Sequence, residues 1–236
     1  MGNTVEILDL NGLNEQGDPP VLGTFEAAGR EIVKLEYAPD GKTVAVVSQD
    51  MRDDLSPALL EVFSTESLQS YGEWKTSAPP DLAFSPDSRW LASWYRTGEA
   101  FITCYSLDPD SAKATEYKFN QRGVWDSATF SPDSQVLAAA SSLGQITFWT
   151  VQEQQLSESW GAKRNSVVTN LAYDPDNRFL AITGPEGVEL RQQSDGALVG
   201  FATVQVNEVA FVKQENALFL IGLDWAGAIQ VWRIDQ

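Results

Sequence analysis

The feature of this sequence that most constrains its fold is a short proline turn that recurs along the chain. The copies read YAPDG, FSPDS, FSPDS and YDPDN, with prolines at Pro39, Pro86, Pro132 and Pro175. These prolines lie 47, 46 and 43 residues apart, and a degraded copy, FVKQEN, places Lys213 a further 38 residues on. A period of about forty residues is typical of stacked repeat architectures. The chain is therefore expected to repeat one structural unit five times.

Each unit shows the same order of strand and turn signals. Apolar residues alternate ahead of the turn, as in Val33, Leu35 and Tyr37, which predicts a strand with one favoured face. Pro-Asp followed by Gly, Ser or Asn favours a tight reversal. A nearly continuous apolar run follows, such as VLAAAS at 136–141, and then a third segment and a weaker fourth. These patterns predict four antiparallel strands per unit, named a to d.

The predicted fold is all-β: a β-propeller of four-stranded antiparallel blades, about five in this chain, forming one domain over 1–236. One unit cannot bury both faces of its own sheet, so neighbouring sheets must stack on it, and radial stacking produces a propeller. A two-sheet sandwich is the alternative, but it gives no reason for the turn to repeat. The predicted units are 30–77, 78–122, 123–163, 164–204 and 205–236, after an N-terminal partial unit, 4–29.

Three segments, LAFSPDSRWLAS, ATFSPDSQVLAAASSLGQITFW and LIGLDWAGAIQVW, resemble WD40-type repeats. The resemblance covers most of the chain and implies a propeller that binds other proteins. The sequence departs from the family pattern because it has no histidine, so the family's buried polar network is missing and cohesion is expected from large apolar side chains. At the strand c tryptophan position the units carry Phe63, Tyr105, Trp149, Gln192 and Trp232.

The first and last segments bear on how a ring would close. VEILDLN reads as a strand c and VLGTFEAA as a strand d, whereas the fifth unit ends after its strand c. We expect the N-terminal strand d to complete the last blade, which leaves no exposed sheet edge. The alternative is a piece of a larger propeller whose open edges pair with another chain. The protein is then a monomer if the ring closes and an edge-paired oligomer if it does not.

Charge and composition exclude several classes of partner. The net charge is −17 with only 16 basic residues, which argues against binding to nucleic acid phosphates and to anionic membranes. No stretch reaches the roughly twenty apolar residues of a membrane span, and the first residues lack the pattern of a signal peptide. We expect a soluble protein, in the cytoplasm by preference, and leave secretion open.

The sequence carries no enzymatic motif, so a non-enzyme without a cofactor is expected. Phosphate-binding glycine loops and nucleophile elbows are absent, and the lack of histidine removes His-containing triads and zinc sites. Cys104 is the only cysteine, and its apolar surroundings predict a buried hydrophobe. The weak metal candidate is a calcium loop at Asp50, Asp53 and Asp54. It lacks the order of carboxylates in known calcium loops, so a solvated loop is the favoured interpretation.

The scarce basic residues suggest a patch that binds a partner. In a propeller, the d-to-a and b-to-c loops share one face, and Trp and Arg are enriched at interface hot spots. The competing interpretation is that the charges are ordinary surface groups and that the one aromatic residue plugs the channel. The residues assigned to this patch are Arg30, Lys75, Arg122, Trp125, Lys163 and Arg164.

The leading functional hypothesis is a non-catalytic scaffold that binds a protein partner on that loop face. The resemblance implies this role, because a fold by itself does not determine function. One alternative is a small-molecule or carbohydrate-binding propeller, or the remnant of a hydrolase, that uses the central channel. Another is a structural or sensor segment of a longer multidomain protein.

Overall fold

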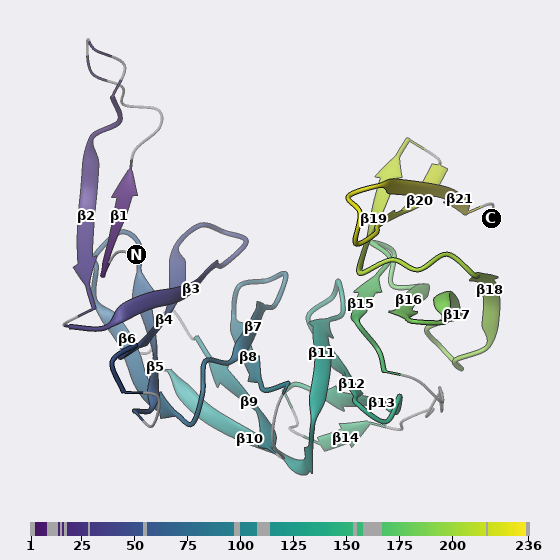
Figure 1. The fold of residues 1–236 in the computed structure, drawn as a ribbon, viewed down its shortest axis with the longest axis horizontal. Helices are drawn as coiled ribbons and strands as arrows, with labels where there is room; N and C mark the ends of the chain where they lie inside the picture. The colour runs from purple at the N-terminus through teal and green to yellow at the C-terminus, as the bar shows by residue number, and fades with distance from the viewer. Residues whose placement is uncertain are drawn as a thin grey trace.

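A computed structural model shows an all-β protein whose strands form six antiparallel sheets arranged along an open arc (Figure 1). The prediction of an all-β fold built from small antiparallel sheets is confirmed. The structure describes residues 3–8, 14, 16, 18–27, 29–53, 56–96, 100–107, 114–152, 155–157, 167–215 and 217–234.

Every sheet is built only from strands that are consecutive in the chain, as repeated units require. Sheet β1–β2 has two strands, β19–β21 has three, and the sheets β3–β6, β7–β10, β11–β14 and β15–β18 have four each. The strands are β1 (Thr4–Leu8), β2 (Val21–Glu26), β3 (Glu31–Tyr37), β4 (Thr43–Gln49), β5 (Ala58–Ser64), β6 (Ser70–Thr76), β7 (Asp81–Phe84), β8 (Trp90–Trp94), β9 (Ala100–Ser106), β10 (Thr115–Gly123), β11 (Trp125–Phe130), β12 (Val136–Ser141), β13 (Ile146–Thr150), β14 (Gln155–Ser157), β15 (Asn170–Tyr173), β16 (Phe179–Gly184), β17 (Gly187–Gln192), β18 (Leu198–Ala202), β19 (Glu208–Gln214), β20 (Ala217–Leu223) and β21 (Ile229–Ile234).

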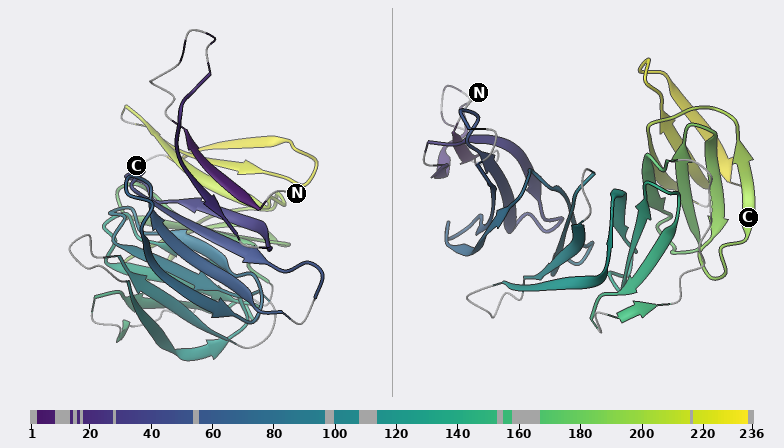
Figure 2. Two further views of the ribbon diagram at one scale, coloured as in Figure 1. Left: turned by 90° about the vertical axis from the view of Figure 1, so that its left-hand side faces the viewer. Right: turned by 60° about the horizontal axis from the view of Figure 1, so that its bottom comes forward.

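The first strand of each unit lies on the inner side of the arc. Strands β3, β7, β11, β15 and β19 contact one another in that order, each touching the first strand of the next sheet. The later strands of each sheet fan outward, which the two views of Figure 2 show from the side and from below. The inner strands therefore set the spacing between sheets.

Five hydrophobic clusters hold the sheets together, one between each pair of successive sheets. Successive side chains on a strand point to opposite faces, so the second strand of a sheet serves two clusters. In β4, Val44 and Val46 pack toward β1–β2, whereas Ala45 and Val47 pack toward β7–β10. Strands β8, β12 and β16 divide their side chains in the same way. This explains why these segments are almost continuously apolar.

The third strand of most units contributes an aromatic residue that packs toward the preceding sheet. Phe63, Tyr105, Trp149 and Trp232 each belong to the cluster shared with that sheet. Trp149 stacks on Phe119 of the preceding sheet, with ring centroids 5.0 Å apart. Because truncating a buried aromatic residue typically costs about 3–5 kcal/mol, these contacts supply the cohesion that the missing polar network would otherwise give.

The recurring Pro-Asp turns share one backbone geometry. The fifth residue of each turn adopts a positive φ between 51° and 71°, a conformation that glycine and asparagine tolerate and serine reaches at a cost. Its N–H donates to the carbonyl of the second turn residue in the four turns that contain proline, at 2.8–3.0 Å. The residues with positive φ are Gly41, Ser88, Ser134, Asn177 and Glu215.

Each of these turns is also bonded to the turn of the next unit, and we call this series of contacts the turn chain. The Asp40 N–H donates to Ser88 Oγ at 3.0 Å, and the Asp87 N–H donates to Ser134 Oγ at 3.0 Å. Further along, Asn177 Nδ2 donates to Asp133 Oδ2 at 3.1 Å. Lys213, which replaces the proline in the last turn, donates its Nζ to the Asp176 carboxylate at 2.7 Å. The repeat thus fixes neighbouring sheets in register at one edge of the arc.

The expected closure of a ring by the N-terminal strand is wrong. Strand β2 pairs with β1, and among the described residues β21 pairs only with β20. The reason is that the β1–β2 hairpin packs on β3–β6 as the sheet before it. Phe25 lies against Phe63 with ring centroids 4.3 Å apart, and Val5 joins the same cluster. Strand β2 is thereby held at the opposite end of the arc from the sheet it was expected to complete.

The turn chain generates a stability prediction at Ser134. Ser134→Ala should destabilise the protein by roughly 0.5–1.5 kcal/mol, because the Asp87 N–H loses its hydrogen-bond acceptor, Ser134 Oγ. Ser134→Gly should cost less, because glycine relieves the positive φ of 60° while losing the same bond. Urea unfolding of the three proteins measures the order. Equal stability of the alanine variant and the wild type would show that the turn chain contributes nothing.

Candidate functional site

Arg30 lies in the loop ahead of β3 and makes an internal contact. Its Nη2 donates to the carbonyl of Pro57, in the loop between β4 and β5. From that second loop, Arg52 Nη2 donates back to the Gly29 carbonyl at 3.3 Å. The d-to-a and b-to-c loops of this unit therefore do meet on one face. Arg30 serves to join them.

Trp125 is the aromatic member of the predicted patch, and it is buried with 1% of its surface exposed. Its ring meets Trp149 edge-on at 5.3 Å between centroids, within the cluster between the sheets β7–β10 and β11–β14. Its position ahead of strand a looked like a loop in the sequence, but it begins β11 opposite Ser141. The structure therefore offers no exposed tryptophan at this position, and the residue serves the core.

Of the other predicted patch residues, the structure describes the whole of Lys75 and the backbone of Arg122. Lys75 is exposed on β6, opposite Leu59 of β5. Arg122 lies on β10, paired with Phe101 of β9, and only its backbone is described. Lys163 and Arg164 lie outside the described residues.

In the loop predicted as a weak calcium site, the described carboxylates bind neighbouring side chains. Asp50 accepts hydrogen bonds from Arg52 Nε at 3.0 Å and from Nη2 at 3.1 Å, and the Arg52 side chain and backbone lower the pKa of Asp50. Asp53 Oδ2 accepts from Ser56 Oγ at 2.8 Å, and Asp54 lies outside the described residues. Within the described ranges no group of three or more carboxylate or cysteine side chains is placed to hold a metal ion.

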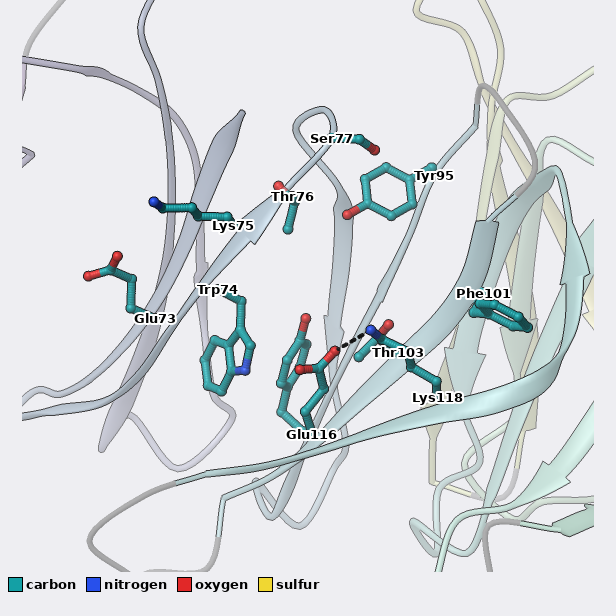
Figure 3. A pocket seen from close by; sticks show the side chains of 11 residues that line it. Glu73, Trp74, Lys75, Thr76, Ser77, Tyr95, Phe101, Thr103, Glu116 and Lys118 are labelled. Atoms are coloured by element: carbon teal, nitrogen blue, oxygen red, sulfur yellow. Dashed lines mark ion pairs between the residues drawn. The ribbon is translucent and has the colours of Figure 1, made fainter. Parts of the chain in front are cut away.

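A cleft of about 450 Å³ opens between the sheets β3–β6 and β7–β10, toward their outer strands. Trp74 of β6 forms one wall, and the side chains of β9 and β10 form the other (Figure 3). Trp74 packs on Tyr105 of β9 with ring centroids 4.3 Å apart, which makes an aromatic floor. Figure 3 shows Glu73 and Lys75 pointing away from Trp74, as alternation along a strand requires.

Polar groups from β10 and from the segment after β8 face this cleft. Glu116 and Lys118 lie on β10, opposite Tyr105 and Thr103 of β9, and form an ion pair at 3.1 Å. Tyr95 follows β8 and points its hydroxyl toward the cleft (Figure 3). Burial raises the pKa of Tyr95, and the nearby Glu116 charge adds to that rise although a hydrogen bond with Thr76 lowers it. The Tyr95 hydroxyl therefore keeps its proton at neutral pH and can donate a hydrogen bond to a ligand.

A second polar cluster joins the inner strands of the same two sheets. Asp81 of β7 accepts from Lys34 Nζ of β3 at 2.7 Å and from Arg96 Nε at 2.6 Å. Burial alone would raise the pKa of Asp81, but the two cations outweigh it and hold that pKa below its usual range. Both cations bind the same carboxylate, and Lys34 of β3 thereby links its sheet to Asp81 of β7. We call this cluster the tie between the two sheets.

The last sheet exposes an apolar outer face. Strand pairing places Ile221 beside Val231 and Leu223 beside Ile229 on the face that points away from β15–β18. The exposed fractions are 66% for Ile229 and 59% for Val231, and Leu223 and Val212 are also exposed. Large uncovered apolar patches mark interaction surfaces.

Comparison with known proteins does not assign a function. No protein-family model matches the sequence, and no curated protein matches it significantly. None of the described segments forms a helix of the length and apolarity needed to cross a membrane. Function must therefore be inferred from the cleft and the exposed face.

Sequence reasoning missed both of these surfaces. The cleft residues Trp74, Glu116 and Lys118 lie on two strands d, SYGEWKT and TEYKFN. Alignment of these two segments by their repeat position could have shown that both carry polar and aromatic groups at alternate positions. The exposed face could have been read from Ile229 and Val231, once the ring was known to be open.

The tie at Asp81 generates a pH-dependent prediction. Because the folded pKa is depressed, the tie stabilises the fold above the unfolded pKa, near 3.9, and its contribution disappears as the pH falls through the folded value. Asp81→Asn should cost about 1 kcal/mol at pH 7, since the partners are partly exposed. The difference from wild type should vanish in acid. Unfolding free energies of the wild type and Asp81→Asn, measured from neutral pH down through the folded pKa of Asp81, check this prediction. Glu66→Gln, which changes an exposed carboxylate, is the control. A difference between wild type and Asp81→Asn that stays constant with pH would contradict the prediction.

Proposed function

We propose that the protein is a sector of a WD40-type β-propeller that acts as a non-catalytic interaction scaffold, and that its last sheet docks on a second copy of the chain. The observation that carries this proposal is the uncovered apolar face of β19–β21. Ile229 and Val231 are more than half exposed there, whereas Trp232 and Ile234 of the same strand are partly buried against the cluster shared with β15–β18.

Support for the propeller class comes from the arrangement of the sheets. Successive sheets contact through their first strands, the later strands fan outward, and the turn chain links each unit to the next. Repeated radial stacking of this kind is what a propeller requires. The loop face near Arg30 is a second proposed surface, but burial of Trp125 removes its aromatic member, so the last sheet is favoured.

Continuity with the rest of the stack indicates what should cover the exposed face. Each pair of successive sheets shares one apolar cluster, and the second strand of each full sheet is apolar on both sides. Strand β20 has the same pattern, since Leu218 and Leu220 are buried while Phe219 and Ile221 point outward. The fitting occupant is therefore another β-sheet with an apolar face.

The polarity of the two ends favours a pairing of two identical faces. The outer side of β1–β2 presents Thr4, Glu6, Thr24 and Glu26 beside the exposed apolar residue Leu22. Stacking the apolar face on that end would bury carboxylates without partners, which is costly. Two copies that join through their last sheets avoid this cost, and such a two-fold contact closes at a dimer.

Light scattering at increasing protein concentration tests the proposal. We expect a monomer–dimer equilibrium that strengthens as salt is raised, because each copy carries a net charge of −17 and salt screens the repulsion between copies. Val231→Lys should abolish the dimer. The added positive charge reduces that repulsion, so a loss of dimer would report the lost apolar contact.

Leu143→Lys is the matched control, because Leu143 is also highly exposed but lies in the loop between β12 and β13. Its dimerisation should equal that of the wild type. A protein that stays monomeric at every concentration and salt level would overturn the proposal. So would a dimer that survives Val231→Lys.

A further inference from the structure

We propose that the cleft between β6 and β9–β10 binds a neutral carbohydrate of one or two sugar units. This site lies between two sheets and is independent of the last sheet, so it does not rest on self-association. Its volume of about 450 Å³ falls within the roughly 300–1,000 Å³ of small-molecule sites.

The cleft exists because the two sheets separate toward their outer strands. Near the inner strands the gap is filled by apolar side chains, including Leu60, Leu82 and Leu91, all of them buried. Farther out, the aromatic pair of Trp74 and Tyr105 closes the apolar cluster. Beyond that pair the facing residues are polar, so the space between the sheets is left open to a ligand.

The lining combines an aromatic surface with hydroxyl groups. Trp74 is half-buried, so part of its indole remains available beside Tyr105. Apolar ring faces pack on aromatic side chains, while a small number of placed polar groups fixes orientation. Thr103, Tyr95 and Ser77 supply hydroxyls that both donate and accept. A sugar ring, with an apolar face and a rim of hydroxyls, matches both parts of this lining.

The charges in the cleft are balanced, which decides against an ionic ligand. Glu116 and Lys118 pair with each other, and Glu73 and Lys75 of the rim point away from Trp74 (Figure 3). The lining holds two acidic and two basic side chains, so a ligand with a net charge gains no net electrostatic attraction from the cleft. A neutral polyol can instead donate to the Glu116 carboxylate and accept from the Lys118 ammonium, and hydrogen bonds to charged groups are the stronger ones.

Saturation-transfer NMR and calorimetry with maltose and cellobiose test the proposal. We expect at least one of them to bind with a millimolar or tighter Kd. Glu116→Gln should weaken binding roughly tenfold or more, because a charged acceptor is lost. Tyr95→Phe should weaken binding roughly 2- to 10-fold, because it removes one neutral hydroxyl and keeps the ring in place.

Trp225→Ala is the matched control, since Trp225 is a highly exposed tryptophan in the loop between β20 and β21, away from the cleft. It should leave the affinity unchanged. Circular dichroism of each variant separates loss of binding from loss of folding. The proposal is overturned if neither sugar binds, if both cleft variants bind as the wild type does, or if glycine betaine or lysine binds in place of the sugars.

Discussion

The rest of the structure depends on one physical constraint: the central strand of each full sheet is apolar on both sides, so a sheet must be covered twice. Strand β12 shows the constraint most simply, because Leu137 and Ala139 pack toward one neighbour while Ala138 and Ala140 pack toward the other. Small alanines in this strand let the sheets approach closely. No sheet of this kind is stable alone, and the stack is the smallest structure that buries these faces.

Apolar burial has no direction, so a second device must fix how far each sheet is rotated against the next. The turn chain performs this task, because each Pro-Asp turn bonds the turn of the following unit. A hydrogen bond at one edge and an apolar cluster along the face together fix the rotation of each sheet relative to its neighbour. The positive φ at Ser88 and Ser134 is a local cost of holding the hydroxyl where the preceding turn can reach it.

The sequence was sufficient to predict what each unit does locally. Alternation, the Pro-Asp turn and the apolar run identify β11, β12 and the turn between them, and the burial of Cys104 followed from its apolar strand. Closure of the ring could not be predicted, because the pattern of VLGTFEAA indicates a strand but not its partner, which is set by pairing with β1 and by the contact of Phe25 with Phe63. Trp125 was misplaced for a related reason, since a residue at the start of a strand has no periodicity to show which side it faces. The cleft depends on the separation of two sheets, which no single segment encodes.

The need to cover both faces of a sheet also applies at the two ends of the arc, and the two terminal sheets differ in how their outer faces are built. A stack of repeats needs a polar outer face on its terminal units, and β1–β2 is the more polar of the two ends, with Thr4, Glu6 and Glu26 outward beside Leu22, and Val5 inward. The last sheet does not, because Ile221, Ile229 and Val231 continue the two-sided pattern of the interior sheets. A polar substitution of these residues would cost nothing in the core, since their partners across the sheet face solvent. Their apolar character is what a contact outside the stack would need, and this is the physical basis for proposing a second sheet as the occupant.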